Sequence, residues 1–125
     1  MHRILFYIGL GSCTGGICRF LTQQYIQKHF PSSFPFGTLA VNVVGCFIIG
    51  MAYGLSMKGN FLSPQLRVFL ITGFCGGYTT FSSFAYENIS LMQDGEMFYT
   101  FLYIAFSIII GFGSAYLGIL LIKSI

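Results

Sequence analysis

Charged residues are scarce in this chain. Of its 125 residues, six are Lys or Arg and three are Asp or Glu, so charged residues make up only 7%. A soluble domain carries about 25% charged residues, so most of this surface cannot face water. A run of basic residues is also lacking, and this argues against a nucleic-acid partner.

The patterns of common enzymes and metal sites are lacking as well. No P-loop, H-E-x-x-H or G-x-S-x-G motif is present, and Gly9-x-Gly11 is not followed by the rest of a dinucleotide-binding motif. The cysteines form no C-x-x-C pair and no histidine lies near them, so we expect small buried hydrophobes rather than metal ligands: Cys13, Cys18, Cys46 and Cys75. We therefore do not expect an enzyme.

Hydrophobic residues, in contrast, make up 55% of the chain and fall into four long segments. A membrane-spanning helix needs about 20 mostly apolar residues. The sequence predicts an all-α integral membrane protein, with one four-helix domain over residues 1–125 and spans at about 4–26, 36–57, 65–92 and 97–122. Ser63 and Pro64 are expected to be the N-cap and first residue of the third helix.

The N-terminal segment has an alternative interpretation. Its basic start, its apolar run and a loose lipoprotein-like box at Leu10-Gly11-Ser12-Cys13 are also features of a signal peptide. The apolar pattern continues past Cys13, however, and this favours a first transmembrane helix.

Loop charges and small residues bear on topology. One side of the predicted bundle holds four basic residues, and the other holds one basic and two acidic residues: Arg3, Lys58, Arg67 and Lys123 against Lys28, Asp94 and Glu96. This bias favours a cytoplasmic N-terminus. Three small-x-x-x-small pairs favour a tight bundle, by generic helix packing, and a dimer: Gly11 with Gly15, Gly50 with Gly54, and Gly73 with Gly77.

The third segment contains a stretch that is poor helix material, residues 73–84. Three glycines and two threonines there are expected to break the helix between about Gly76 and Thr80. Irregular backbone at membrane depth persists only where it is buried in protein or lines a polar cavity. After the break, Phe81 and Phe84 share one helix face, and their positive ring edges could contact an anion, although a plain core role is the alternative.

Polar side chains inside the apolar segments are the other candidates. Thr38 and Asn42 are four residues apart in the second segment, and Tyr103 and Ser107 are four apart in the fourth. Asn42 must find a partner, because an unpaired amide in lipid is costly. Asn42 is either hydrogen-bonding support between helices or a donor to a dehydrated anion, whereas the pair Tyr103 and Ser107 alone favours satisfied core residues.

Arg19 is the one basic residue well inside an apolar segment. An intramembrane charge normally faces protein or water. Arg19 therefore either attracts anions near a pore mouth, extends its guanidinium to the membrane interface, or forms a structural salt bridge for which Glu87 is a candidate partner.

Together these motifs resemble those of the Fluc (CrcB) fluoride channel family. The first is Gly11-x-x-x-Gly15-x-x-x-Arg19. The second is Gly37-Thr38-Leu39-x-Val41-Asn42-x-x-Gly45-x-Phe47-x-x-Gly50. The third and most specific is Gly73-Phe74-Cys75-Gly76-Gly77-x-Thr79-Thr80-Phe81-Ser82-Ser83-Phe84, followed by Glu87.

The resemblance implies a multi-pass protein of the cell (inner) membrane that forms an antiparallel, dual-topology homodimer with two fluoride pathways. It implies that the pathway residues are Phe81, Phe84, Asn42, Ser107, Tyr103, Thr38, Ser82 and Ser83. It also implies a structural sodium ion at the dimer interface, held by the backbone carbonyls of Gly76 and Thr79 from both subunits. Carbonyl oxygens freed by a helix break suit a hard cation.

Two residues depart from the family pattern. Ser83 stands where many relatives carry Thr, and Tyr78 stands where an apolar residue is expected. The basic bias also fits dual topology poorly, which leaves a paired heterodimer as an alternative to the homodimer.

The functional expectation is passive fluoride export driven by the membrane potential. A small multidrug-type cation/proton antiporter is the alternative, but the first segment offers Arg19 and no carboxylate. A non-transporting assembly subunit is a further alternative function.

Overall fold

The computed structural model describes residues 1–59 and 62–125, and all regular secondary structure in these ranges is helical. The elements are α1 (His2–His29), α2 (Phe36–Met57), α3 (Pro64–Arg67), the π-helical segment η1 (Val68–Cys75), α4 (Gly76–Tyr78), α5 (Phe81–Gln93) and α6 (Met97–Lys123). Within the described ranges, four helical segments are long and apolar enough to cross a membrane: His2–His29, Phe36–Met57, Pro64–Gln93 and Met97–Lys123. These segments match the four spans that the sequence predicts. The protein is therefore a multi-pass membrane protein.

Local sequence explains where the segments begin and turn. The Ser63 hydroxyl accepts a hydrogen bond from the Leu66 N–H at 3.1 Å, and Pro64 occupies the first turn, as the sequence predicts. Between α5 and α6 the chain reverses within three residues, where Gly95 adopts φ of 79°. Glycine populates this left-handed region without steric penalty, so it permits the tight reversal.

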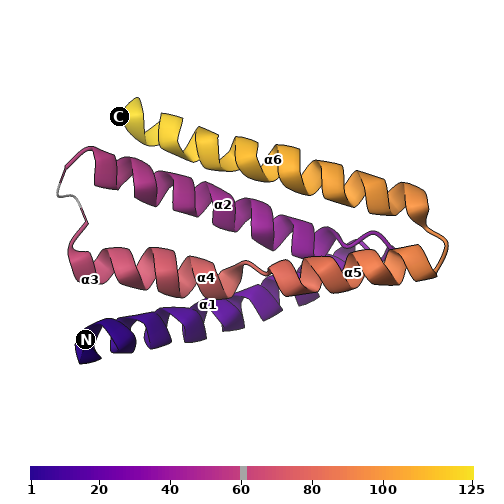
Figure 1. The fold of residues 1–125 in the computed structure, drawn as a ribbon, viewed down its shortest axis with the longest axis horizontal. Coiled ribbons are helices and arrows are strands. Elements are labelled where there is room, and N and C mark those ends of the chain that lie inside the picture. Colours follow the sequence, from indigo (N-terminus) through magenta and orange to yellow (C-terminus); the bar gives the residue numbers. More distant parts are fainter. Residues whose placement is uncertain (60–61) are drawn as a thin grey trace.

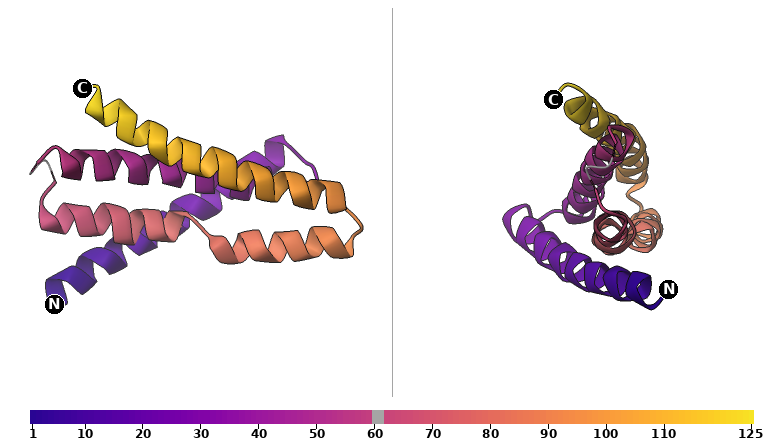
Figure 2. Two further views of the ribbon diagram at one scale, coloured as in Figure 1. Left: turned by 45° about the horizontal axis from the view of Figure 1, so that its top comes forward. Right: turned by 90° about the vertical axis from the view of Figure 1, so that its left-hand side faces the viewer.

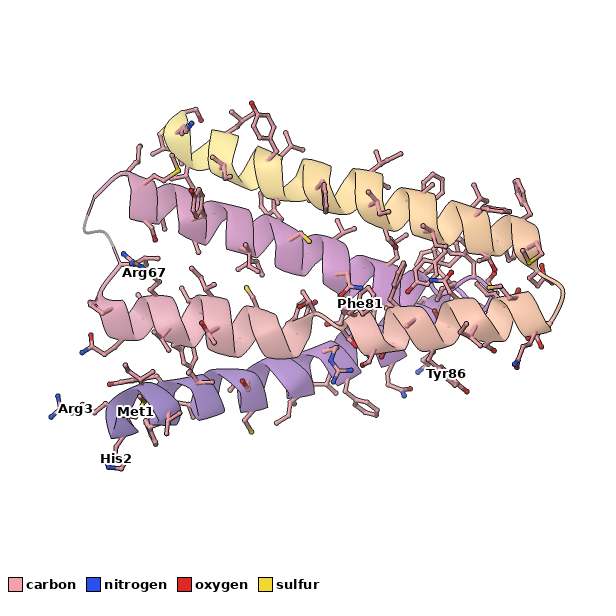
Figure 3. The ribbon with its side chains drawn as sticks, viewed as in Figure 1. Met1, His2, Arg3, Arg67, Phe81 and Tyr86 are labelled. Atoms are coloured by element: carbon pink, nitrogen blue, oxygen red, sulfur yellow. The ribbon has the colours of Figure 1, made fainter. Side chains whose placement is uncertain are left out.

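The two termini lie at the same end of the bundle (Figure 1). Arg3 and Arg67 both lie at this end (Figure 3). Lys58 follows the last residue of α2 and Lys123 ends α6, so they belong to the same end. The charge asymmetry inferred from the sequence is thus present in the fold. Which face of the membrane this end occupies stays a prediction.

Glycines bring the helices into close contact. A Cβ atom on Gly11 would lie 2.5 Å from the Phe69 carbonyl oxygen, and one on Gly77 would lie 2.6 Å from the Ser12 carbonyl oxygen. A Cβ on Gly50 would collide with the Ala115 carbonyl. The small-residue pairs of the sequence therefore join α1 to η1 and α4, and α2 to α6, within one chain. These contacts account for the tight bundle, and whether the chain dimerises stays a prediction.

Viewed end-on, α1 and α6 lie at opposite edges of the assembly, with α2 and the third segment between them (Figure 2). A cluster of buried side chains, Phe34, Leu91 and Tyr103, packs with Leu39, Phe84, Tyr99 and Leu102. Burial of the cysteines was predicted correctly only for Cys75. Cys13 is exposed, and Cys18 and Cys46 are partly exposed.

Candidate functional site

The third segment is interrupted at its middle. Helix α4 ends at Tyr78, Thr79 and Thr80 are extended, and α5 begins at Phe81. A break in this stretch was predicted, but from the glycines, and these remain helical: Gly76 and Gly77 lie in α4. Gly77 lies against α1, where a Cβ atom would meet the Ser12 carbonyl, and side-chain hydrogen bonds accompany the interruption at Thr80.

Asn42 and Thr80 supply those hydrogen bonds. The Thr80 N–H donates to Asn42 Oδ1 at 2.8 Å, and Asn42 Nδ2 donates to the Thr80 carbonyl at 3.2 Å. The Thr80 hydroxyl accepts from the Ser83 N–H at 3.1 Å and so caps α5. In an unbroken helix these two N–H groups would reach the carbonyls of Gly76 and Thr79. Both carbonyl oxygens therefore lose their usual helical donors.

A cavity of about 310 Å³ adjoins the interruption. Its walls come from α2, the break, α5 and α6: Asn42, Cys46, Ile49, Thr79, Thr80, Phe81, Phe84, Ser107, Ile108 and Phe112. The Ser107 Oγ is buried, and among the described residues it has no hydrogen-bond partner. Asn42 Nδ2 carries a second N–H beyond the one directed at Thr80. The cavity thus combines polar donors with aromatic and aliphatic walls.

The two phenylalanines of the predicted pathway lie together. Their ring centroids are 5.7 Å apart with planes at 41°, and Phe84 in turn packs on Tyr103 at 4.9 Å. Phe84 is partly buried, whereas Phe81 is 79% exposed at the start of α5 (Figure 3). Phe81 and Phe84 therefore both line the cavity, and Phe81 is largely exposed in the single chain.

A second cavity of about 310 Å³ lies one helical turn away along α2. It is lined by Phe20, Gln23, Gln24, Gln27, Gly37, Thr38, Ser83 and Glu87. Thr38 donates to Glu87 Oε2, and the fully buried Tyr103 donates to Glu87 Oε1, both at 2.8 Å. The predicted pathway residues thus fall into two groups, with Thr38, Ser83 and Tyr103 around Glu87. Ser82 is exposed and lies 3.3 Å from the Thr80 hydroxyl.

Arg19 does not pair with Glu87, so that suggestion is wrong. Its Nε donates to the Gly77 carbonyl at 3.0 Å, and its Nη1 donates to Gln23 Oε1 at 3.4 Å. The guanidinium thereby satisfies a carbonyl in the last turn of α4, where the helix dipole favours a cation. Tyr78 supports the same junction, since its hydroxyl donates to the Thr22 hydroxyl at 3.1 Å. This departure from the family pattern therefore ties α4 to α1.

Sequence reasoning missed the hydrogen bonds of Glu87 and any role for Gln23. Gln23 Nε2 donates to the Thr38 hydroxyl at 3.0 Å, and Gln27 Oε1 accepts from the Gly37 N–H at 3.1 Å. A signal was present, because Arg19, Gln23 and Gln27 are four residues apart and share one face of α1. A polar stripe on an apolar helix indicates a face turned toward protein.

These features define a class: a small, multi-pass helical membrane protein whose broken third segment borders a polar and aromatic cavity. The chain belongs to the CrcB family, described as CrcB-like protein, Camphor Resistance (CrcB), whose sequence profile matches residues 6–119. Curated relatives named "Fluoride-specific ion channel FluC" align over nearly the whole chain. The protein from Flavobacterium psychrophilum is 42% identical over 123 residues, covering 98% of this chain and 99% of the relative. That of Chlorobium phaeobacteroides (strain BS1) is 48% identical, covering 98% and 94%.

Proposed function

We propose that this protein is a fluoride-selective ion channel that exports cytoplasmic fluoride passively. The names of the full-length relatives support this, and they describe channels rather than enzymes. The observation that carries the proposal is the cavity beside the break. There Ser107, whose buried hydroxyl has no partner among the described residues, lines the same space as Asn42. A small dehydrated anion would satisfy both donors.

Selectivity would follow from how the anion's hydration shell is replaced. Fluoride is small and a strong hydrogen-bond acceptor, so hydroxyl and amide donors compensate it better than they compensate a larger halide. The edges of Phe81 and Phe84 would add weak positive electrostatic contacts. Fluoride enters cells as neutral HF and becomes trapped as the anion in a less acidic cytoplasm. A negative-inside potential then drives it outward by about 2.3 kcal/mol per charge per 100 mV.

The working unit we propose is an antiparallel homodimer with dual topology. Two cavity-lining residues, Phe81 and Phe112, are 79% and 76% exposed in the single chain. A second copy would supply the missing wall. Antiparallel pairing would place one basic end at each membrane face, so one of the two protomers would have to insert against its loop-charge bias.

A sodium ion at the centre of this dimer is part of the proposal. The carbonyls of Gly76 and Thr79 fit such an ion, because the N–H groups that would occupy them in a helix go to Asn42 and to the Thr80 hydroxyl. Gly76 is also exposed, and a Cβ atom there would meet nothing within 4 Å. Bound sodium would supply a positive charge that holds carbonyl oxygens of the two breaks together.

Flux from proteoliposomes tests the function. Vesicles loaded with potassium fluoride and reconstituted with wild-type protein should release fluoride when valinomycin permits potassium to leave, whereas chloride-loaded vesicles should retain their anion. Equal chloride and fluoride rates would contradict selectivity, and absence of fluoride release would contradict the channel. Rescue of a fluoride-sensitive deletion strain by this chain alone would distinguish a homodimer from an obligate heterodimer. Release of a lipophilic cation coupled to protons would instead indicate the multidrug-type antiporter.

A further inference from the structure

Glu87 engages two hydroxyl donors on different helices. Its Oε2 accepts from Thr38 on α2, and its Oε1 accepts from Tyr103 on α6, each at 2.8 Å. Thr38 is 2% exposed and Tyr103 is fully buried, so neither hydroxyl is open to bulk water. A charged acceptor makes these hydrogen bonds stronger than those between neutral groups.

Gln23 fixes the direction in which the Thr38 proton points. An amide nitrogen can only donate, so the hydrogen bond from Gln23 Nε2 makes the Thr38 oxygen the acceptor. The single hydroxyl proton of Thr38 is then directed at Glu87. With Gln23 in place, therefore, a mobile anion that sought a donor here would compete with a carboxylate for it.

We propose that Glu87 is a tethered competitor for the transported anion, and that Gln23 is the positioning residue that keeps Thr38 turned toward it. The inference rests on the proposed fluoride pathway. Between ions, the carboxylate holds the donors of Thr38 and Tyr103, which satisfies the buried hydroxyls. An arriving anion accepts the hydrogen bonds of these two hydroxyl groups in place of the carboxylate, and like-charge repulsion turns the carboxylate away.

The adjoining cavity gives the displaced carboxylate a place to go. Glu87 and Ser83 both line this space of about 310 Å³, together with the amides of Gln24 and Gln27. These groups offer hydrogen-bond donors to a carboxylate that has left Thr38 and Tyr103. Competition of this kind favours the strongest small acceptor, so it would contribute to selecting fluoride over chloride.

Fluoride dependence of flux gives the first test. Glu87→Gln retains the shape but removes the charged acceptor, and the fluoride concentration for half-maximal flux should fall about tenfold, the scale of one hydrogen bond to a charged group. Gln23→Met changes no charge and leaves the Thr38 hydroxyl free to rotate, so the fluoride concentration for half-maximal flux should fall severalfold. Gln65→Met, on α3 and outside the lining of this cavity, is the chemically matched control and should leave it unchanged. A fall in Glu87→Gln alone would indicate simple charge repulsion and overturn the competitor role.

Infrared difference spectra give a readout independent of flux. Adding fluoride to wild-type protein in nanodiscs should shift a carboxylate stretching band, and Glu87→Gln should abolish that change. Chloride at equal concentration should produce none. A wild type that conducts fluoride but shows no carboxylate change would overturn this inference while leaving the channel intact, and absence of conduction in the wild type would overturn both. If Glu87→Gln does not fold, the Gln23→Met flux and the wild-type spectrum still decide.

Discussion

Asn42 pairs with the backbone of Thr80 through two hydrogen bonds, one to its N–H and one to its carbonyl, at 2.8 and 3.2 Å. The side-chain amide thus replaces the helical partners of a residue that is 38 positions away in sequence. This pairing links α2 to the break and orients the amide: Oδ1 accepts from the Thr80 N–H, and Nδ2 donates to the Thr80 carbonyl with one N–H to spare. The same residue therefore supports the interruption and supplies a donor.

Substitutions at Asn42 separate these two tasks. Asn42→Asp retains the acceptor for the Thr80 N–H, but it removes the amide donor and adds a negative charge to the cavity wall. Like charges about 4 Å apart repel by about 4 kcal/mol at an effective dielectric constant of 20, so fluoride flux should fall at least about 100-fold. The measurement is proteoliposome efflux, with size-exclusion chromatography to verify folding. Normal flux in Asn42→Asp would contradict a fluoride contact at this residue.

The helical part of the fold could be predicted almost completely. Long apolar runs set the four spans, and the second was placed over its observed residues, Phe36–Met57. Ser63 and Pro64 carry their own start signal, because capping depends on neighbours within three residues. The outer bounds of these segments depend on residues close in sequence, whereas the break before Phe81 involves Asn42 from α2.

Partnerships between helices could not be predicted in the same way. Spacing shows that Thr38 and Asn42 share a face, but it does not show which helix that face meets. Arg19 and Glu87 were the obvious opposite charges, yet Arg19 binds a carbonyl and Glu87 binds hydroxyls. The glycines were likewise interpreted as helix breakers, although Gly76 and Gly77 lie in α4 and Gly77 packs against α1. In each case the deciding neighbour comes from a distant part of the chain.

Arg19 should contribute to stability more than to conduction. Its hydrogen bond to the Gly77 carbonyl crosses from α1 to α4, and hydrogen bonds of charged groups contribute about 1.5–3 kcal/mol. Arg19→Gln should therefore lower thermal stability in detergent while fluoride flux per folded protein stays within about twofold. An anion-attracting role makes the opposite forecast: unchanged stability, and a flux defect that disappears at high ionic strength.

Sodium should stabilise the assembled protein if the carbonyls of Gly76 and Thr79 hold it. Purification in N-methylglucamine chloride instead of sodium chloride, at matched ionic strength, should lower the melting temperature and the dimer fraction. A ligand at 100 times its dissociation constant stabilises by about 2.7 kcal/mol, so returning sodium should restore both. Static light scattering and a thermal aggregation assay measure the two quantities. Potassium at the same concentration is the control, and equal effects of the two cations would argue against a selective site.

Gly45 and Thr79 offer a test of the break by compensation. A Cβ atom on Gly45 would collide with Cγ2 of Thr79, while the next neighbour, Cδ2 of Tyr78, lies at an ordinary 3.6 Å. Gly45→Ala should thus destabilise the protein by about 1–3 kcal/mol, the usual penalty of overpacking. Thr79→Ser removes only the colliding methyl group and retains the hydroxyl that donates to the Cys75 carbonyl at 2.8 Å.

The double variant Gly45→Ala/Thr79→Ser should therefore be more stable than Gly45→Ala alone, with a favourable coupling of about 1 kcal/mol or more in a double-mutant cycle. Gly113→Ala serves as the control, because a Cβ atom there meets nothing within 4 Å, and it should be neutral or slightly stabilising. Thermal stability in detergent measures all four variants. Strict additivity of the two stability changes would show that α2 does not contact the break at Thr79. The fluoride flux of the double variant would show how closely conduction depends on this contact.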